Sequence, residues 1–195
     1  MSTHDIIVVG ASAGGLEALK KLAAGMPPNF AGTVFIVWHI SPEYPSLLPE
    51  ILNRAGPLPA AHARDKEAVC PGRIYVAPPD YHLVLEDSRV CLYHGPKENH
   101  ARPAADALFR SAAEVYGERV VGVVLSGMLF DGAAGLITIK CNGGVTIVQD
   151  PSEARFSSMP RSAINRDHPD YIQPVAEIAA TIRRLAQGKV HATAR

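Results

Sequence analysis

The sequence has little of several features that would define a class of protein. Its three cysteines, Cys70, Cys91 and Cys141, are an odd number at wide spacing, which predicts neither a disulfide framework nor a zinc site. Nineteen basic residues balance nineteen acidic ones, so no basic surface for nucleic acid is predicted. No apolar run approaches the roughly 20 residues that cross a bilayer. The short polar start, Met1 to Asp5, predicts no signal peptide.

These absences predict a protein of the reducing cytoplasm that does not insert into a membrane. No spacing of histidines typical of a metal site is found, and we expect no metal and no cofactor. Cys141 is expected to be a small packing residue rather than a nucleophile. Apolar residues make up 47% of the chain and charged residues 19%, a globular composition. We expect one domain over residues 1–188 and a frayed tail over 189–195.

Continuous apolar runs alternate with segments of helical spacing along most of the chain. Because such runs are typical of strands buried on both faces, they predict a parallel sheet. Two further runs joined around Asp87 and Ser88 predict a β-hairpin. The fold class is therefore α/β: a doubly wound, mostly parallel, Rossmann-like three-layer sheet with a hairpin insertion. The predicted parallel strands are 5–10, 33–38, 73–77, 120–125 and 145–148; the hairpin is 83–86 with 89–93; the helices are 16–26, 46–54, 103–117, 133–140 and 174–188.

The first predicted strand runs into Gly10-Ala11-Ser12-Ala13-Gly14, which matches the G-x-S-x-G pattern of a nucleophile elbow between a strand and a helix. In such an elbow the N–H after the nucleophile, here Ala13, is a candidate oxyanion donor. Two plainer interpretations stay open at this point. Ser12 could be only a helix N-cap, or the glycine-rich turn could bind a phosphate.

His39 ends the second predicted strand, where a dinucleotide-binding fold usually carries an acidic residue. This position argues against a nicotinamide site. A histidine at the same sheet edge as Ser12 can instead take the serine proton near neutral pH. A lone histidine after a strand is more often structural, so its weight comes from this placement.

Asp131 follows the predicted strand 120–125, in Ser126-Gly127-Met128-Leu129-Phe130-Asp131-Gly132-Ala133, and by itself would most simply cap a helix. A serine hydrolase, however, needs a carboxylate that orients the imidazole. Because Ser12, His39 and Asp131 all follow separate parallel strands, their side chains are predicted to meet at one edge of the sheet. The sequence thus predicts a Ser-His-Asp triad.

These motifs, together with Ala77-Pro78-Pro79-Asp80-Tyr81-His82 and residues 143–150, resemble the catalytic domain of the chemotaxis-receptor methylesterases (CheB-type) from about Ile6 to Leu185. The segment Ser158-Met159-Pro160-Arg161 adds to the resemblance. That family hydrolyses glutamate γ-methyl esters on cytoplasmic helices of bacterial chemoreceptors, and many members deamidate glutamines.

The resemblance implies that Ser12 is the nucleophile, His39 the base and Asp131 its orienter, with the Met128 N–H in the oxyanion hole. Leu129 stands where the family usually has glycine. We expect Leu129 and Phe130, and also Met159, to line the substrate cleft.

Family members typically carry an N-terminal receiver domain, whereas this chain starts at the first catalytic strand. The resemblance therefore implies a stand-alone methylesterase, either unregulated or controlled by a separate response regulator. Two alternatives remain: a hydrolase of the same chemistry acting on another protein or a small ester, and a non-catalytic regulatory or nucleotide-binding module.

Overall fold

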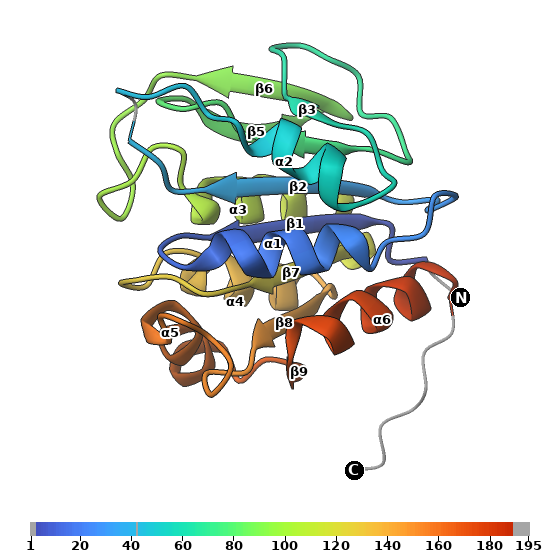
Figure 1. The fold of residues 1–195 in the computed structure, drawn as a ribbon, viewed down its shortest axis with the longest axis vertical. Coiled ribbons are helices and arrows are strands. Elements are labelled where there is room, and N and C mark those ends of the chain that lie inside the picture. The colour runs from blue at the N-terminus through green and yellow to red at the C-terminus, as the bar shows by residue number, and fades with distance from the viewer. Residues whose placement is uncertain (1–2, 42, 189–195) are drawn as a thin grey trace.

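A seven-stranded sheet is the centre of the computed structural model, which describes residues 3–41 and 43–188 (Figure 1). Its strands lie in the order β3-β4-β2-β1-β7-β8-β9, and every neighbouring pair is parallel. The strands are β1 (Ile6–Ala11), β2 (Thr33–Trp38), β3 (Ala60–His62), β4 (Ile74–Val76), β7 (Val120–Val124), β8 (Val145–Gln149) and β9 (Tyr171–Gln173). The predicted parallel α/β fold is confirmed.

Two helical layers cover the sheet, because alternate residues of each strand point to opposite faces. Residues such as Ile7 and Val9 face one core, which packs against the helices in front in Figure 1. Their neighbours Ile6 and Val8 face a second core on the far side. The front layer contains α1 (Gly15–Ala24), α2 (Leu48–Ala55) and α6 (Val175–Ala186); the far layer contains α3 (Ala105–Tyr116), α4 (Ala133–Cys141) and α5 (Ser158–Asp167).

The predicted hairpin insertion is also present, as β5 (His82–Glu86) and β6 (Arg89–Tyr93). Leu83, Leu85 and Val90 join the far core, where the hairpin packs against α3. Within residues 3–41 and 43–188, no helix has the length and apolar character needed to cross a membrane.

The structure differs from the sequence prediction in short elements. The strands β3 and β9 were not predicted, since each is three residues long and pairs with one neighbour at an outer edge of the sheet. Helix α5 was not among the predicted helices; it contains Pro160, but a proline in the first turn lacks only an N–H that the helix does not use. Cys141 was expected to pack inside and is exposed instead. The predicted tail, 189–195, lies outside the described residues.

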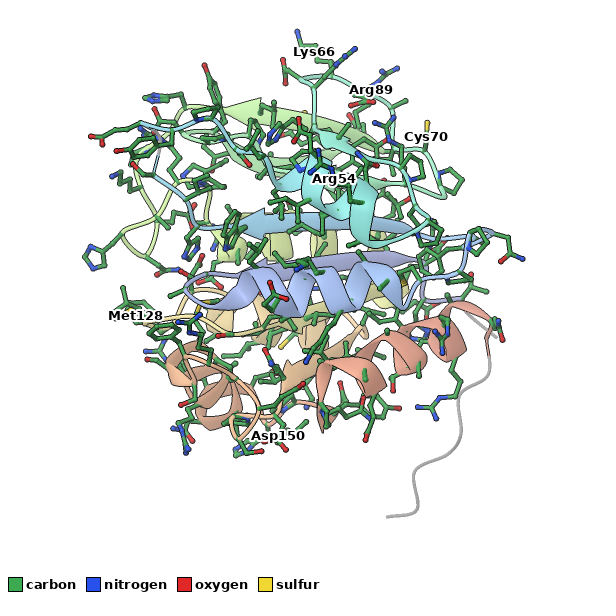
Figure 2. All side chains as sticks on the ribbon, viewed as in Figure 1. Arg54, Lys66, Cys70, Arg89, Met128 and Asp150 are labelled. Atoms are coloured by element: carbon green, nitrogen blue, oxygen red, sulfur yellow. The ribbon has the colours of Figure 1, made fainter. Side chains whose placement is uncertain are left out.

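The strand order creates one crevice at the carboxyl ends of the strands. From β1 the chain builds outward through β2 and β4, and it then returns to place β7 on the other side of β1. The loop after β1 leads to the front layer, whereas the loop after β7 leads to the far layer. Ligands of doubly wound sheets bind where the loops separate in this way. Met128, in the loop after β7, lies at this edge (Figure 2).

Candidate active site

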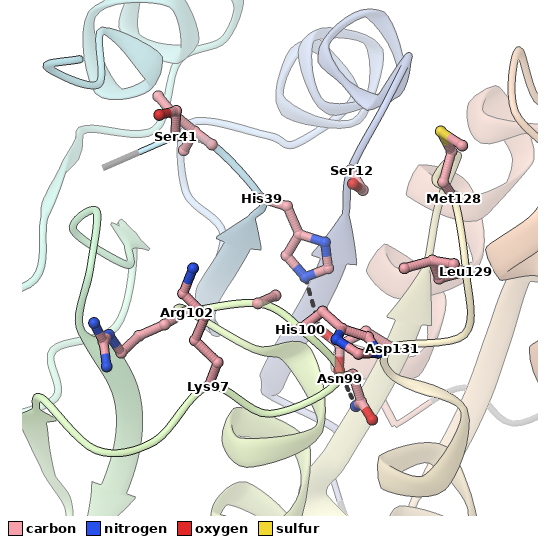
Figure 3. Close-up of a pocket in the computed structure, with 12 residues that line it drawn as sticks. Ser12, His39, Ser41, Lys97, Asn99, His100, Arg102, Met128, Leu129 and Asp131 are labelled. Carbon is pink, nitrogen blue, oxygen red and sulfur yellow. Dashed lines mark hydrogen bonds and ion pairs between the residues drawn. The ribbon is translucent and has the colours of Figure 1, made fainter. Parts of the chain in front are cut away.

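A pocket of about 340 Å³ opens at this crevice, and Ser12, His39 and Asp131 all line it (Figure 3). Met128 and Leu129 form part of one wall, and residues 97 and 99–102 form another. The three side chains that the sequence predicted to meet at the sheet edge therefore share one cavity. They come from the loops after β1, β2 and β7.

Ser12 is fixed by its backbone, and its hydroxyl is left free. Its N–H donates to the carbonyl of Ser126 (3.0 Å), and its carbonyl accepts from the N–H of Gly15 (2.9 Å) and the indole of Trp38 (3.1 Å). Within the described residues the hydroxyl makes no hydrogen bond. The N-cap of α1 is Gly14, at φ +69°, without a side-chain cap. The interpretation of Ser12 as a helix cap is therefore wrong.

Close packing behind Ser12 depends on Gly127. A Cβ built on Gly127 would lie 2.9 Å from Cβ of Ser12 and 2.1 Å from the sulfur of Met159, both too close for real atoms. The N–H of Gly127 also donates to the carbonyl of Phe156 (3.0 Å). Only glycine lets the loop after β7 approach Ser12 this closely.

His39 lies between Ser12 and Asp131 (Figure 3). Its Nε2 is 2.7 Å from Oδ2 of Asp131, and its side chain is 18% exposed. Since an ionised carboxylate only accepts hydrogen bonds, Nε2 carries the proton. When the ring is in its neutral form, its lone pair is then at Nδ1, which is the nitrogen on the Ser12 side of the ring. Such a histidine can accept a proton from a hydroxyl held in the pocket.

Asp131 is almost fully buried and accepts five hydrogen bonds. Besides His39, its donors are the amide of Asn99 (2.8 Å) and the backbone N–H groups of Ala105 (2.6 Å), Asp106 (3.1 Å) and Gly132 (3.0 Å). Burial raises the pKa of Asp131, but the hydrogen bonds from His39, Ala105 and Asn99 outweigh it. The net pKa lies below the ordinary value, so the group is a carboxylate at neutral pH.

The capping role of Asp131 differs from the one that its sequence position suggested. The N-cap of the following helix, α4, is Gly132, with no side-chain cap. Asp131 instead accepts from Ala105 and Asp106, the first two N–H groups of α3. A carboxylate at the positive end of a helix is stabilised by the unpaired N–H groups there. Helix α3 therefore helps to hold Asp131 ionised beside His39.

Two backbone N–H groups beside Ser12 are unpaired. Those of Ala13 and Met128, the predicted oxyanion donors, make no hydrogen bond within residues 3–41 and 43–188. Met128 is 53% exposed and lines the pocket. The unpaired N–H of Met128 therefore belongs to a residue of the pocket wall, whereas Ala13 is not among the residues that line the pocket.

The structure does not bring every predicted cleft residue to the pocket. Leu129 lines it, with φ +65° and half of its surface exposed. Phe130 lies outside the lining, with the Arg166 guanidinium 5.4 Å from its ring. Met159 is fully buried on α5, beneath Gly127. Its burial follows from the helix that the sequence did not predict.

Sequence reasoning missed two partners of Asp131. Asn99 and Asp106 contact the site from the segment before α3 and from its first turn. The run Glu98-Asn99-His100-Ala101 carries only a weak turn signal, and Asp106 follows Pro103 as an ordinary first-turn acid. Within the described residues, no three His, Cys, Asp or Glu side chains gather as metal ligands would.

Comparison with known proteins identifies the family of this chain. The sequence model described as CheB methylesterase matches residues 7–182. A putative protein-glutamate methylesterase/protein-glutamine glutaminase of Leptospira interrogans is 39% identical over 188 residues, covering 96% of this chain and 97% of that protein. A protein-glutamate methylesterase/protein-glutamine glutaminase of Bdellovibrio bacteriovorus is 35% identical over 190 residues, and the chain spans 53% of its length.

A solved structure agrees with these sequence matches. The crystal structure of the Thermotoga maritima CheB methylesterase catalytic domain superposes with a TM-score of 0.88 at 32% identity. The match covers 95% of this chain and 99% of that one.

Proposed function

This chain belongs to the CheB methylesterase family, and on that premise we propose that it hydrolyses glutamate γ-methyl esters on chemoreceptors by a Ser-His-Asp mechanism with an acyl-enzyme. The observation that carries the proposal is the convergence of Ser12, His39 and Asp131 in one pocket, with His39 bonded to a buried carboxylate. The names of the Leptospira and Bdellovibrio relatives support both the ester substrate and deamidation of glutamine as a related activity.

In the first half-reaction the Ser12 hydroxyl attacks the ester carbonyl while Nδ1 of His39 takes the hydroxyl proton. The carbonyl oxygen becomes an oxyanion, which the free N–H groups of Ala13 and Met128 can receive. Collapse breaks the bond to the methoxy group, and His39 returns the proton so that methanol leaves. Asp131 keeps the ring oriented and stabilises its cationic form.

In the second half-reaction His39 takes a proton from water, which attacks the acyl-enzyme. As the resulting tetrahedral intermediate collapses, the bond to the Ser12 oxygen breaks, His39 returns the proton to that oxygen, and the free glutamate side chain leaves. Substrate-free sites often have long contacts that shorten when substrate binds, so the unpaired hydroxyl of Ser12 is compatible with this role. A glutamine side chain would follow the same course with ammonia as the leaving group.

The proposed substrate segment is a methylated receptor helix in the cytoplasm. The test is release of methanol from methylated receptor membranes by the wild type and by Ser12→Ala. We expect release by the wild type and a loss of several orders of magnitude in the variant. Equal release by both proteins, or none by either, would contradict the proposal.

A second candidate function is hydrolysis of another ester by the same chemistry. The observation that favours it is Leu129, whose side chain lines the pocket at a position where the family usually has glycine. Labelling of Ser12 by a fluorophosphonate without methanol release from receptors would favour this candidate. Saturable nucleotide binding without any labelling would instead favour a non-catalytic module. A change of rate on adding a separate response regulator would identify control in trans.

A further inference from the structure

One amide side chain joins the two buried carboxyl groups of the site. Nδ2 of Asn99 lies 2.6 Å from Oδ2 of Asp106 and 2.8 Å from Oδ1 of Asp131. An amide nitrogen has two hydrogens, so it can donate one to each carboxylate, whereas the amide oxygen could donate to neither. Asn99 therefore places a hydrogen-bond donor between the carboxyl groups of Asp106 and Asp131.

The need for such a donor comes from burial. Asp131 is 1% exposed and Asp106 4%. Burial, together with the nearby charge of Asp131, raises the pKa of Asp106, and the N–H of Gly135 (2.6 Å) and the Asn99 amide oppose that rise. Two carboxylates this close in a poorly solvated site disfavour each other's ionised form. Asn99 is the side chain that donates to both.

Asn99 also has a plainer explanation, which the experiment must separate. Glu98 and Ala101 exchange two backbone hydrogen bonds (3.0 and 2.8 Å), and the residues between them have positive φ, +50° at Asn99 and +65° at His100. This geometry is that of a two-residue turn of type I′, where asparagine and glycine are both favoured. A residue chosen only for the turn could be glycine.

Two contacts anchor the chain that leads into the turn. His82 is 2.9 Å from the carbonyl of Pro96 through Nε2, and Arg110 donates to Glu98 (2.7 Å). Figure 3 shows Asn99 beside Asp131 in the wall of the pocket. The anchored turn therefore holds the amide at the place where the two carboxyl groups meet.

We propose that Asn99 is a positioning residue, whose amide holds Asp131 in the orientation and charge state that His39 requires. The inference rests on the proposed function, since it assigns Asn99 a role in the same hydrolysis. The amide does not touch the reacting atoms in this role. It acts through Asp131 on the basicity and direction of the His39 ring.

The test compares Asn99→Gly with Asn99→Asp. Glycine accepts the positive φ and preserves the turn while removing the amide. We expect kcat for methanol release to fall about tenfold with KM nearly unchanged, the effect of losing one hydrogen bond to a charged group. Asn99→Asp keeps the size of the side chain but adds a third carboxylate, and we expect a larger fall.

The pH profile provides a readout that a turn residue would not move. Without the Asn99 donor, the negative charge of Asp131 is less stabilised, which favours protonation of the His39–Asp131 pair. The acid limb of the pH–rate profile should therefore move to higher pH. The extra charge in Asn99→Asp should move it further. The other charged or titratable groups around the pair, which both variants retain, are Asp106 on α3 and Lys97, His100 and Arg102 on the pocket wall.

Asn53→Ala is the matched control. Asn53 also makes two hydrogen bonds through its amide, both 2.8 Å to the backbone of Ala60, on α2 and away from the pocket. We expect it to lower the thermal midpoint without moving the acid limb. A wild-type rate and pH profile in Asn99→Gly would overturn the proposal, as would an equal shift in Asn53→Ala.

An NMR titration of the His39 ring without substrate separates this inference from the proposed function. In Asn99→Gly the midpoint should rise relative to the wild type even if receptor esters are not the substrate. An unchanged midpoint would overturn the inference while leaving methanol release by the wild type unaffected. If a variant is misfolded by near-UV circular dichroism, the same titration on Asn99→Ser, which also lacks the amide, decides the question by the same criterion.

Discussion

The two ends of the proposed triad are held in opposite ways. Ser12 is fixed only through its backbone, and its hydroxyl has no partner within the described residues. Asp131 is fixed through its side chain, by five donors that include His39, Asn99 and the start of α3. The group that must exchange bonds during the reaction is left free, whereas the group that must stay charged is held from several directions.

The comparison also separates two kinds of support. Support for Ser12 depends on how closely chain segments approach, since glycine at 127 allows the contact. Support for Asp131 depends on donors that stabilise charge, because burial alone would raise its pKa. Substitutions near Ser12 should therefore act by displacing atoms, whereas substitutions near Asp131 should act by altering charge.

The largest effect is expected for Asp131→Asn. The new amide can accept from some of the present donors, but it places N–H groups against others, and it cannot stabilise a cationic His39. We expect kcat to fall about 10⁴-fold, as in other enzymes with this triad, measured by methanol release. Asp150→Asn is the control, an aspartate just after β8 at the same sheet edge, whose carboxylate accepts only from Ser152 within the described residues. A rate for Asp131→Asn within tenfold of the wild type would refute the idea that catalysis depends on the charge of Asp131.

Gly127→Ala should disturb the close packing that supports Ser12. The added methyl has no room between Ser12 and Met159, so the loop after β7 must shift and move the nucleophile. We expect about a 100-fold loss of kcat, the cost of a misplacement near 1 Å, together with about 1–3 kcal/mol of stability. Kinetics and urea unfolding measure the two effects. Unchanged kinetics in a destabilised variant would show that this contact supports the fold alone.

Stability at acid pH should sharpen the comparison. The folded pKa of Asp131 lies below its ordinary value, so its stabilising contribution is present above the unfolded pKa and is lost as pH falls through the folded pKa. The free energy of unfolding of wild type should exceed that of Asp131→Asn by about 2 kcal/mol at neutral pH. Urea unfolding as a function of pH should show this difference shrinking in acid. A constant difference would contradict the charged state assigned to Asp131.

The smallest effect is expected for Leu129→Gly. Leu129 has φ +65°, which glycine adopts without strain, and half of its side chain is exposed. We expect stability to rise by at most about 1 kcal/mol, measured as a small increase in Tm. Ile137→Gly is the control, because Ile137 is also exposed but lies inside α4, where glycine costs conformational entropy and should lower Tm. A decrease in both variants would show that the left-handed backbone costs nothing here.

Much of the fold was predictable because its signals are local. Continuous apolar runs predicted five of the seven strands of the sheet, and the segments between them predicted five of the helices. The elements that were missed have weak local signals: three-residue edge strands and a helix whose first turn contains Pro160. Their structure depends on neighbours from elsewhere in the chain.

The sequence by itself determined that Ser12, His39 and Asp131 follow separate strands of one parallel sheet, and this is sufficient to predict that they lie at the same edge. Tertiary structure alone decided the remaining features: which nitrogen of His39 meets Asp131, that Asp131 caps α3 rather than the helix it precedes, and that Asn99 links it to Asp106. The physical reason is distance along the chain. A strand end is set by residues next to it, whereas a buried carboxylate takes its donors from whichever segments the fold brings within hydrogen-bond reach.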